Sequence, residues 1–228
     1  MQGTLKPRVK ICCIASLAEA WQALECGAAA LGLVGEMPSG PGVISDEAIR
    51  EIARRVPPPA ATFLLTSRTD AAEIVEHQRA VGTSTIQIVD ALKTGSYADI
   101  RAALPGIRIV QVIHVSGPES LEEAREAAAQ VDALLLDSGN PRAAVKILGG
   151  TGKTHNWGIS RAIRESVEIP VFLAGGLNPA NVREAIETVH PFGLDVCSGV
   201  RTGGKLDRNK LEQFFEAVEG VKNAWRLF

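Results

Sequence analysis

The sequence predicts an α/β protein with a single (β/α)8 TIM-barrel domain that uses the whole chain, residues 1–228. A short apolar run rich in β-branched residues recurs along the chain, and each run is followed by a segment of helical periodicity. The runs are apolar on both faces, which is typical of parallel strands covered by helices. Eight such units fill the 228 residues and leave no segment for a second domain.

The first four units each pair an apolar strand with a helix. Ser16 is the expected N-cap of the first helix, and Gly27 is expected to end it. Ser45 precedes an acidic turn, which suits the start of the second helix. The predicted strands span residues 8–15, 29–35, 61–67 and 85–90, and the helices span residues 17–25, 45–56, 69–81 and 96–104.

The last four units repeat the pattern, with one glycine-rich insertion after the sixth strand. Pro179 is expected in the first turn of the seventh helix, where a missing N–H is tolerated. The predicted strands span residues 107–115, 133–138, 171–176 and 193–200, and the helices span residues 120–130, 157–166, 179–189 and 207–221. An open doubly wound sheet is the competing architecture, but no G-x-G-x-x-G follows the first strand.

Composition narrows the class of protein. The formal charge is −2 and only 4% of residues are aromatic, which argues against nucleic acid as a partner. No apolar run has the length of a membrane span, and the N-terminus lacks a signal-peptide core, so we expect no membrane partner and a cytoplasmic location. The cysteines show no C-x-x-C spacing and the histidines are scattered, so we expect reduced thiols and no metal site.

In such a barrel, the residues that carry the chemistry lie where the strands end. This position selects Cys12, Cys13, Asp90, His114, Asp137, Ser138, Gly175, Gly176, Ser198 and Gly199. Asp90 and His114 are candidate substrate contacts. The ends of the seventh and eighth strands, with Gly175-Gly176 and Ser198-Gly199, predict a phosphate site, because glycine lets backbone N–H groups approach an anion. The alternative is that these glycines only permit tight turns.

A third glycine cluster, LGGTGKTHNW at residues 148–157, follows the sixth strand. It lacks the first glycine of a Walker A loop, because residue 147 is Ile. We expect a loop that closes over the ligand, with Gly150 at the phosphate and with Lys153 and His155 as further contacts.

Asp137 and Cys12 form a candidate acid and base. A carboxylate that ends an apolar strand is costly to bury unless it is hydrogen-bonded or functional. A thiol is also a good small core residue, and an aspartate can cap a loop, so each residue alone has a structural alternative. Strands 1 and 6 can face each other across the barrel mouth, where a thiolate and a carboxylic acid would move protons. Side-chain alternation places only one of Cys12 and Cys13 inside the barrel.

These segments resemble the phosphoribosylanthranilate isomerase family. KICCI is similar to that family's K-I-C-G-I start, and LLLDS, GGTGKTHNW, AGGLNPANV and DVCSGV resemble its sixth to eighth strand signatures in order. The resemblance implies a barrel without cofactor that performs an Amadori rearrangement, turning an aminoaldose into an aminoketose. It implies that Cys12 is the general base and Asp137 the general acid, and that Gly175, Gly176, Ser198 and Gly199 hold the phosphate.

The sequence also departs from the family pattern. Gly42 stands where the family has the arginine that binds the anthranilate carboxylate, and Cys13 stands in place of a glycine. Val89 and Asp90 replace a His-Gly pair, and Arg201 replaces an acidic residue. Arg201, Arg68 and Arg142 are candidates to replace the missing arginine, so Arg201 is a candidate substrate contact.

Three hypotheses follow from the sequence. The first is an isomerase of N-(5-phosphoribosyl)anthranilate in tryptophan biosynthesis, as a monomer or homodimer. The second is a diverged isomerase or lyase that acts on another phosphosugar, which the missing arginine favours. The third is a phosphate-ligand binder without catalysis, which the presence of both Cys12 and Asp137 disfavours.

Overall fold

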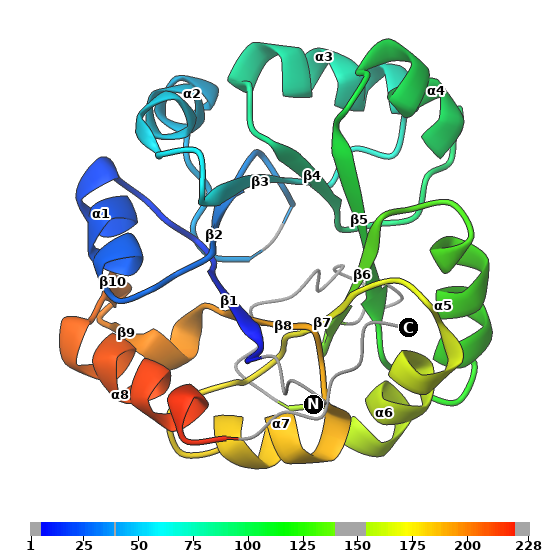
Figure 1. Cartoon of the computed structure of the whole chain (residues 1–228). Coiled ribbons are helices and arrows are strands. Elements are labelled where there is room, and N and C mark those ends of the chain that lie inside the picture. The colour runs from blue at the N-terminus through cyan, green and yellow to red at the C-terminus, as the bar shows by residue number, and fades with distance from the viewer. Residues whose placement is uncertain (1–5, 39, 140–153, 222–228) are drawn as a thin grey trace.

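The structure, a computed structural model, describes residues 6–38, 40–139 and 154–221. Its parallel strands close into a barrel in the order β1 to β8, with helices around it (Figure 1). The strands are β1 (Arg8–Ile11), β2 (Ala30–Val34), β3 (Ala61–Thr66), β4 (Thr85–Ile88), β5 (Arg108–His114), β6 (Ala133–Asp137), β7 (Val171–Leu173) and β8 (Gly193–Val196). The predicted barrel is confirmed, whereas the assignment of all of residues 1–228 to one domain stays a prediction.

One α-helix follows each strand and packs on the outside of the barrel. The helices are α1 (Leu17–Glu25), α2 (Asp46–Arg55), α3 (Ala71–Val81), α4 (Tyr97–Ala103), α5 (Ser120–Ala128), α6 (Trp157–Ser166), α7 (Val182–Val189) and α8 (Arg208–Glu219). Ser16 and Ser45 cap α1 and α2 as predicted, because their side chains accept hydrogen bonds from the first-turn N–H groups. Within the described residues, no helix has the length and apolar character needed to cross a membrane.

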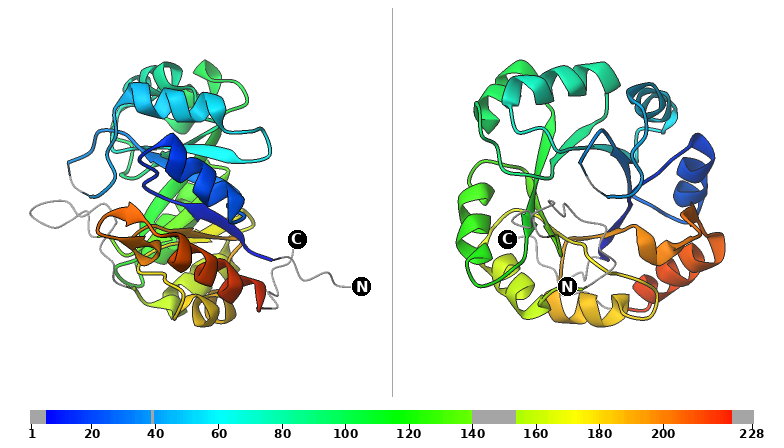
Figure 2. Two further views of the ribbon diagram at one scale, coloured as in Figure 1. Left: turned by 90° about the vertical axis from the view of Figure 1, so that its left-hand side faces the viewer. Right: turned by 180° about the vertical axis from the view of Figure 1, so that it is seen from behind.

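Pairing between the first and last strands closes the barrel. Ile11 of β1 is in register with Val196 of β8, and the Cys12 N–H donates to the Val196 carbonyl at 2.9 Å. Because the strands are parallel, the loops that follow them gather at one end of the barrel, which we call the barrel mouth (Figure 2).

Side chains alternate along the strands between two buried cores. One core lies between strands and helices and includes Leu64 and Leu134, whereas the other fills the barrel interior and includes Phe63, Leu135 and Phe172. This alternation is the period-two pattern of β-structure. It decides which strand-end side chains face the barrel axis.

Four element boundaries differ by three or more residues from the sequence-based expectation. Strand β7 ends at Leu173 rather than at residue 176. The first strand ends at Ile11 rather than at residue 15, because Cys13 has a φ of 62° and cannot continue a strand. After β8 the chain forms a 3₁₀ turn (Ser198–Val200) and a short hairpin of β9 (Arg201–Thr202) and β10 (Lys205–Leu206). Helix α7 begins at Val182 instead of Pro179.

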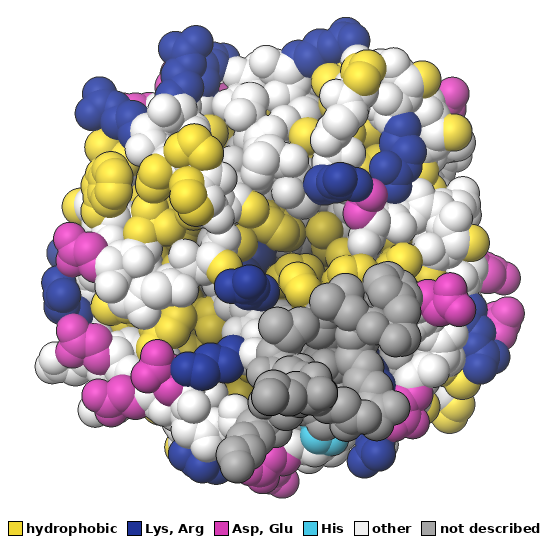
Figure 3. Space-filling model, in the orientation of Figure 1, with side chains coloured by type: hydrophobic (Ala, Val, Ile, Leu, Met, Phe, Trp, Pro, Cys, Tyr) yellow, Lys and Arg dark blue, Asp and Glu magenta, His cyan; other side chains and the backbone are white. Residues whose placement is uncertain are grey.

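The face of the molecule shown in Figure 3 carries cationic and anionic side chains interspersed around its rim. Along the outer helices such charges pair in i,i+4 positions, as Arg161–Glu165 and Arg208–Glu212 do, each at 2.9 Å. Exposed pairs of this kind contribute little stability. The outer helices therefore carry locally balanced charge.

Candidate active site

Cys12 lies directly after β1 on the inner side of the barrel mouth. Its side chain is 6% exposed and packs with the interior core. The neighbouring strand β2 has Gly32 here, and a Cβ on that glycine would stand 2.8 Å from the Cys12 sulfur and 3.0 Å from Lys10 Nζ. The missing side chain makes room for the thiol and places it beside an ammonium group.

That ammonium group belongs to a buried ion pair. Lys10 Nζ lies 2.8 Å from Asp195 Oδ1, and the two side chains are 0% and 8% exposed. Burial works to lower the pKa of Lys10, but attraction to Asp195 and to Cys12 raises it above its usual range. Neither residue was singled out from the sequence, although a lysine and an aspartate inside the apolar strands RVKI and GLDV are a usable signal.

Asp137 is the last residue of β6, and its carboxyl is buried. Oδ1 accepts a hydrogen bond of 2.7 Å from the Ser138 N–H. Burial raises the pKa of Asp137 above its usual value, although this hydrogen bond and His114 act in the opposite direction. A carboxyl in this setting holds its proton to a higher pH than usual and is suited to donate it.

His114 and Asp90 lie on the neighbouring strands. His114 ends β5 in register with Asp137, and its Nε2 donates to the Val89 carbonyl oxygen at 2.9 Å. Asp90 follows β4, and its Oδ1 accepts a hydrogen bond of 2.9 Å from the Ala91 N–H. The structure brings His114 against the candidate acid, while substrate contact by either residue stays a prediction.

Two glycine segments meet at the mouth after β7 and β8. Gly175 and Gly176 have φ values of 82° and 65°, which glycine adopts without steric cost. Gly199 lies in the 3₁₀ turn and packs so closely on the Leu177 carbonyl oxygen that a Cβ would overlap it. These backbone conformations and close contacts require glycine, and phosphate binding by this segment stays a prediction.

The segment that follows β6 reaches the same place. A Cβ on Gly175 would stand 3.0 Å from Ser138 Oγ and 3.1 Å from His155 Nδ1. Burial lowers the pKa of His155 to about 4, and its Nε2 lies 2.6 Å from Ser160 Oγ. His155 is therefore a neutral side chain near pH 7. Gly150 and Lys153, which the sequence also predicted here, lie outside the described residues.

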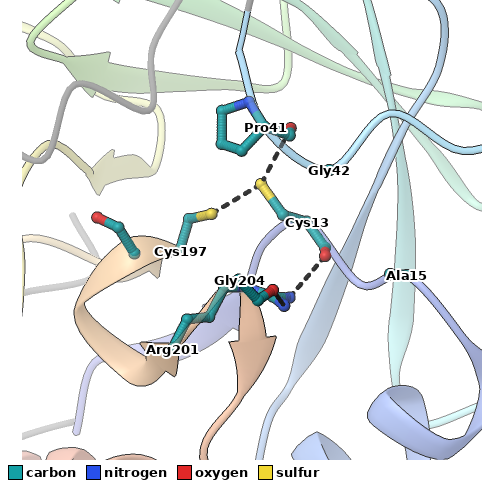
Figure 4. A pocket seen from close by; sticks show the side chains of 8 residues that line it. Cys13, Ala15, Pro41, Gly42, Cys197, Arg201 and Gly204 are labelled. Atoms are coloured by element: carbon teal, nitrogen blue, oxygen red, sulfur yellow. Dashed lines mark hydrogen bonds between the residues drawn. The ribbon is translucent and has the colours of Figure 1, made fainter.

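Cys13 does not follow the alternation expected of it. Its left-handed backbone turns the thiol away from the helix layer, so that its sulfur lies 2.8 Å from Cys197 Sγ and 3.6 Å from the Pro41 carbonyl oxygen (Figure 4). Gly42, with a φ of 81°, comes so close that a Cβ there would overlap the Cys13 Cβ. These residues border a pocket of about 250 Å³, lined by Cys13, Ala15, Pro41, Gly42, Cys197, Ser198, Arg201 and Gly204.

Arg201 lies beneath this pocket and hydrogen-bonds inside the protein. Its guanidinium forms two bonds of 3.0 Å with the Glu19 carboxylate and donates to the carbonyl oxygens of Cys12 and Cys13 at 3.3 Å and 2.6 Å. Burial works to raise the pKa of Glu19, but hydrogen bonds from Arg201, Leu206 and Ala15 lower it. With a side chain only 8% exposed, Arg201 positions the backbone around Cys12, and its contact with substrate stays a prediction.

The described site therefore joins a thiol, a protonatable carboxyl and a cluster of glycines at one barrel mouth. Among the residues that the structure describes, no group of three or more His, Cys, Asp or Glu side chains is arranged to hold a metal ion. The arrangement suits proton transfer on a phosphorylated small molecule.

Comparison with known proteins points to one family. The family model described as N-(5'-phosphoribosyl)anthranilate (PRA) isomerase matches residues 9–217. A similar curated protein is the N-(5'-phosphoribosyl)anthranilate isomerase of Methanocella arvoryzae, which is 35% identical over 216 residues, or 94% of this chain and 99% of that protein.

Solved structures agree with the sequence comparison. The phosphoribosyl anthranilate isomerase of Thermotoga maritima superimposes with a TM-score of 0.77 at 31% identity, covering 94% of this chain and 100% of that one. An isomerase of the same name, solved with reduced 1-(o-carboxyphenylamino)-1-deoxyribulose 5-phosphate, has a TM-score of 0.74 at 28% identity, with coverage of 94% and 100%.

Proposed function

The chain belongs to the phosphoribosylanthranilate isomerase family, and we infer that it catalyses the Amadori rearrangement of N-(5-phosphoribosyl)anthranilate in tryptophan biosynthesis. The observation that carries this inference is the meeting of a buried thiol, a buried carboxyl and a cluster of glycines at one barrel mouth. An aldose–ketose isomerisation needs ring opening and proton transfers, which these groups can supply.

We propose that the backbone after β7 and β8 binds the substrate phosphate. Gly175, Gly176 and Gly199, together with Ser198, offer N–H groups and a hydroxyl without side chains that would keep the anion away. Binding of the phosphate fixes one end of the sugar. Its C1 and C2 atoms are then held toward the centre of the mouth, between β1 and β6.

Asp137 acts as the general acid in the first step. It donates its proton to the ribose ring oxygen, the bond from C1 to that oxygen breaks, and the nitrogen lone pair forms an iminium bond to C1. The burial that raises the pKa of Asp137 supports this role, because the carboxyl must be protonated before each turnover.

Cys12 acts as the general base in the second step. Its thiolate removes the proton from C2, and the electron pair forms the C1–C2 double bond and neutralises the iminium nitrogen. The enol then becomes the ketone as C1 gains a proton and the C2 hydroxyl loses one. The ammonium of Lys10, next to Cys12 and held by Asp195, stabilises negative charge on the sulfur.

The other two hypotheses are less well supported. A diverged enzyme for another phosphosugar rests on Gly42, which removes one carboxylate-binding arginine from the family pattern. Relatives that match this chain over nearly its whole length carry the isomerase name, and this does not favour that alternative. A binder without catalysis leaves the paired thiol and carboxyl without a role.

We also propose a cytoplasmic enzyme that is a monomer or a homodimer. A neighbour from Thermotoga maritima is described as a dimeric isomerase from which monomers were generated, so both states occur in one fold. Sedimentation velocity of the purified chain distinguishes them, and a trimer or larger assembly contradicts the proposal.

The function is tested by adding the enzyme to N-(5-phosphoribosyl)anthranilate generated in situ. Conversion removes the fluorescence of the substrate, so the signal decays at a rate proportional to enzyme concentration. Absence of decay with the wild-type protein overturns the function. A parallel screen of phosphorylated aminosugars that lack the carboxylate distinguishes the second hypothesis, which predicts turnover only in that set.

A further inference from the structure

Cys13 and Cys197 form a thiol pair that the isomerisation does not use. Their sulfurs lie 2.8 Å apart and face each other across the gap between the end of β1 and the end of β8 (Figure 4). The two residues are 184 positions apart in the chain, so the barrel closure alone brings them together. Cys12, by contrast, is placed beside Lys10 and Gly32 inside the barrel.

The two thiols differ in their readiness to ionise. The hydrogen bond with Cys13 lowers the pKa of Cys197 despite burial, and the positive charge of Arg201 acts in the same direction. Hydrogen bonds with Cys12 and Cys197 raise the pKa of Cys13 above its usual range. Of the two sulfurs, Cys197 therefore ionises more readily than Cys13, and reactive dithiols share this asymmetry.

Two further observations concern access to this pair and the backbone that holds it. Both residues line the 250 Å³ pocket at the mouth, and because Cys197 is partly exposed whereas Cys13 is buried, a small reagent meets Cys197 first. The backbone of Cys13 also has a φ of 62°, a left-handed conformation that a glycine adopts without strain. A strained non-glycine residue at a pocket is a reason to look for a function of its side chain.

We propose that Cys13 and Cys197 are a dithiol modification site, which a low-molecular-weight disulfide converts to an intramolecular disulfide bond. The Cys197 thiolate attacks one sulfur of the reagent R–S–S–R, forms a mixed disulfide and releases R–S⁻. This leaving thiolate takes the Cys13 proton, and the Cys13 sulfur attacks Cys197 and expels the second R–S⁻, which solvent protonates. Two protein thiols are oxidised, and one reagent disulfide is reduced to two R–SH.

The disulfide bond would link two segments that carry proposed functional residues. Cys13 follows the base Cys12, and Cys197 precedes the turn of Ser198 and Gly199. Closing the sulfurs from 2.8 Å to the roughly 2.05 Å of a disulfide pulls these segments together. Oxidation is therefore expected to lower kcat/KM, and reduction to restore it.

The test uses the reduced full-length enzyme and oxidised glutathione as the reagent. We expect the protein to lose two of its four free thiols without retaining glutathione, and proteolytic fragments to show a Cys13–Cys197 cross-link. Dithiothreitol should restore both the thiol count and the activity. These chemical readouts do not depend on which reaction the enzyme catalyses.

Matched variants make the result decisive. Cys197→Ser should form no cross-link, and Cys13→Gly should stop at the mixed disulfide on Cys197. Cys26→Ser should oxidise as the wild type does, because Cys26 caps α1 and does not line the pocket. A cross-link that maps to Cys12 or Cys26, or a wild-type protein that keeps all four thiols under these conditions, overturns the proposal.

Discussion

The two sides of the barrel mouth are built in different ways. The side formed after β6, β7 and β8, which we call the phosphate side, contains Gly175, Gly176 and Gly199. Gly199 packs against the Leu177 carbonyl oxygen, and Gly175 packs against Ser138 and His155. The side formed by the end of β1 and the loop after β2, which we call the ring side, depends on side-chain contacts of Cys13 and Arg201. One side depends on positions that lack a side chain, and the other depends on side-chain contacts.

The difference matches where the sequence departs from the family pattern: the glycines after β7 and β8 follow that pattern, whereas Cys13, Gly42 and Arg201 do not. On the phosphate side a new Cβ would meet main-chain or buried atoms within about 3 Å, so few substitutions fit. On the ring side, the cysteine at residue 13 and the glycine at residue 42 compensate each other, because Cys13 fills the space that a side chain at residue 42 would need. Backbone-built recognition resists change, whereas side-chain recognition can be rebuilt.

The largest expected effect tests whether the two sides act as one catalytic unit. Cys12→Ser on the ring side and Asp137→Asn on the phosphate side should each lower kcat/KM by about 10² to 10⁴-fold, the usual contribution of a general acid or base. The double variant should lose little more than the worse single variant, because both steps belong to one reaction. Stopped-flow decay of substrate fluorescence measures these rates.

A binding control separates chemistry from folding in these variants. Both should still bind reduced 1-(o-carboxyphenylamino)-1-deoxyribulose 5-phosphate in a calorimetric titration, because the glycine backbone is intact. If either variant keeps its kcat within threefold of the wild type, the residue is not the acid or base assigned to it.

The sequence contained enough information to predict the barrel and most of this site. Apolar strands and helix caps are local patterns, so the eight strand–helix units and the caps at Ser16 and Ser45 were predictable. The glycines were predictable because a missing side chain is visible in a sequence. The ends of β1 and β8 were not, because the left-handed turn at Cys13 depends on contacts with distant segments.

The sequence also did not predict which side chains meet across the barrel. Lys10 and Asp195 lie inside apolar strands, and only barrel closure brings their charged groups to 2.8 Å. Gly42 and Cys13 read as two separate departures in the sequence, yet they form one contact in the structure. Arg201 was predicted as a candidate substrate contact, and its ion pair with the distant Glu19 could not be predicted from the sequence.

A second prediction concerns acid sensitivity on the phosphate side. His155 has a pKa of about 4 in the folded protein, against an ordinary value of 6.5, so between these pH values the unfolded chain binds the proton and the folded one does not. Stability is therefore lost as pH falls from 6.5 to 4, by an upper limit of about 3 kcal/mol. His155→Gln should flatten this loss in urea unfolding at pH 7 and pH 4.5.

The matched control for that prediction is His190→Asn, which replaces a left-handed residue by one that tolerates this backbone. It should keep the acid sensitivity of the wild type. Asp137 contributes with the opposite sign, because its raised pKa means that stability is lost as pH rises through it. If His155→Gln loses as much stability between pH 7 and pH 4.5 as the wild type does, the acid sensitivity does not arise from His155.

A third prediction tests the backbone construction directly. In Gly199→Ala the new Cβ overlaps the Leu177 carbonyl oxygen, so the segments after β7 and β8 must separate. Charge-assisted hydrogen bonds contribute roughly 1.5–3 kcal/mol each, so loss of one at the phosphate should raise KM by about 10- to 100-fold with a smaller change in kcat. Gly203→Asn is the control, because its Cβ meets nothing within 4 Å and asparagine tolerates the φ of 57° at this position. Equal KM values for the two variants contradict a backbone-built phosphate side.

The smallest expected effect asks whether the ring side was rebuilt by coupled exchange. Gly42→Arg alone should be destabilising, because its Cβ overlaps Cys13 and its φ is 81°. Cys13→Gly removes the overlapping Cβ and relieves a left-handed residue, which costs roughly 1–2 kcal/mol in a non-glycine residue. The double variant should therefore be more stable than the sum of the single effects by about 1–2 kcal/mol, a typical coupling for residues in contact. Urea unfolding of the four proteins measures this coupling, and additive effects mean that Cys13 and Gly42 changed independently.

The same variants test recognition of the substrate carboxylate. A lower KM in the double variant than in Cys13→Gly indicates that an arginine at residue 42 reaches this carboxylate, because only a new charge-assisted contact separates the two proteins.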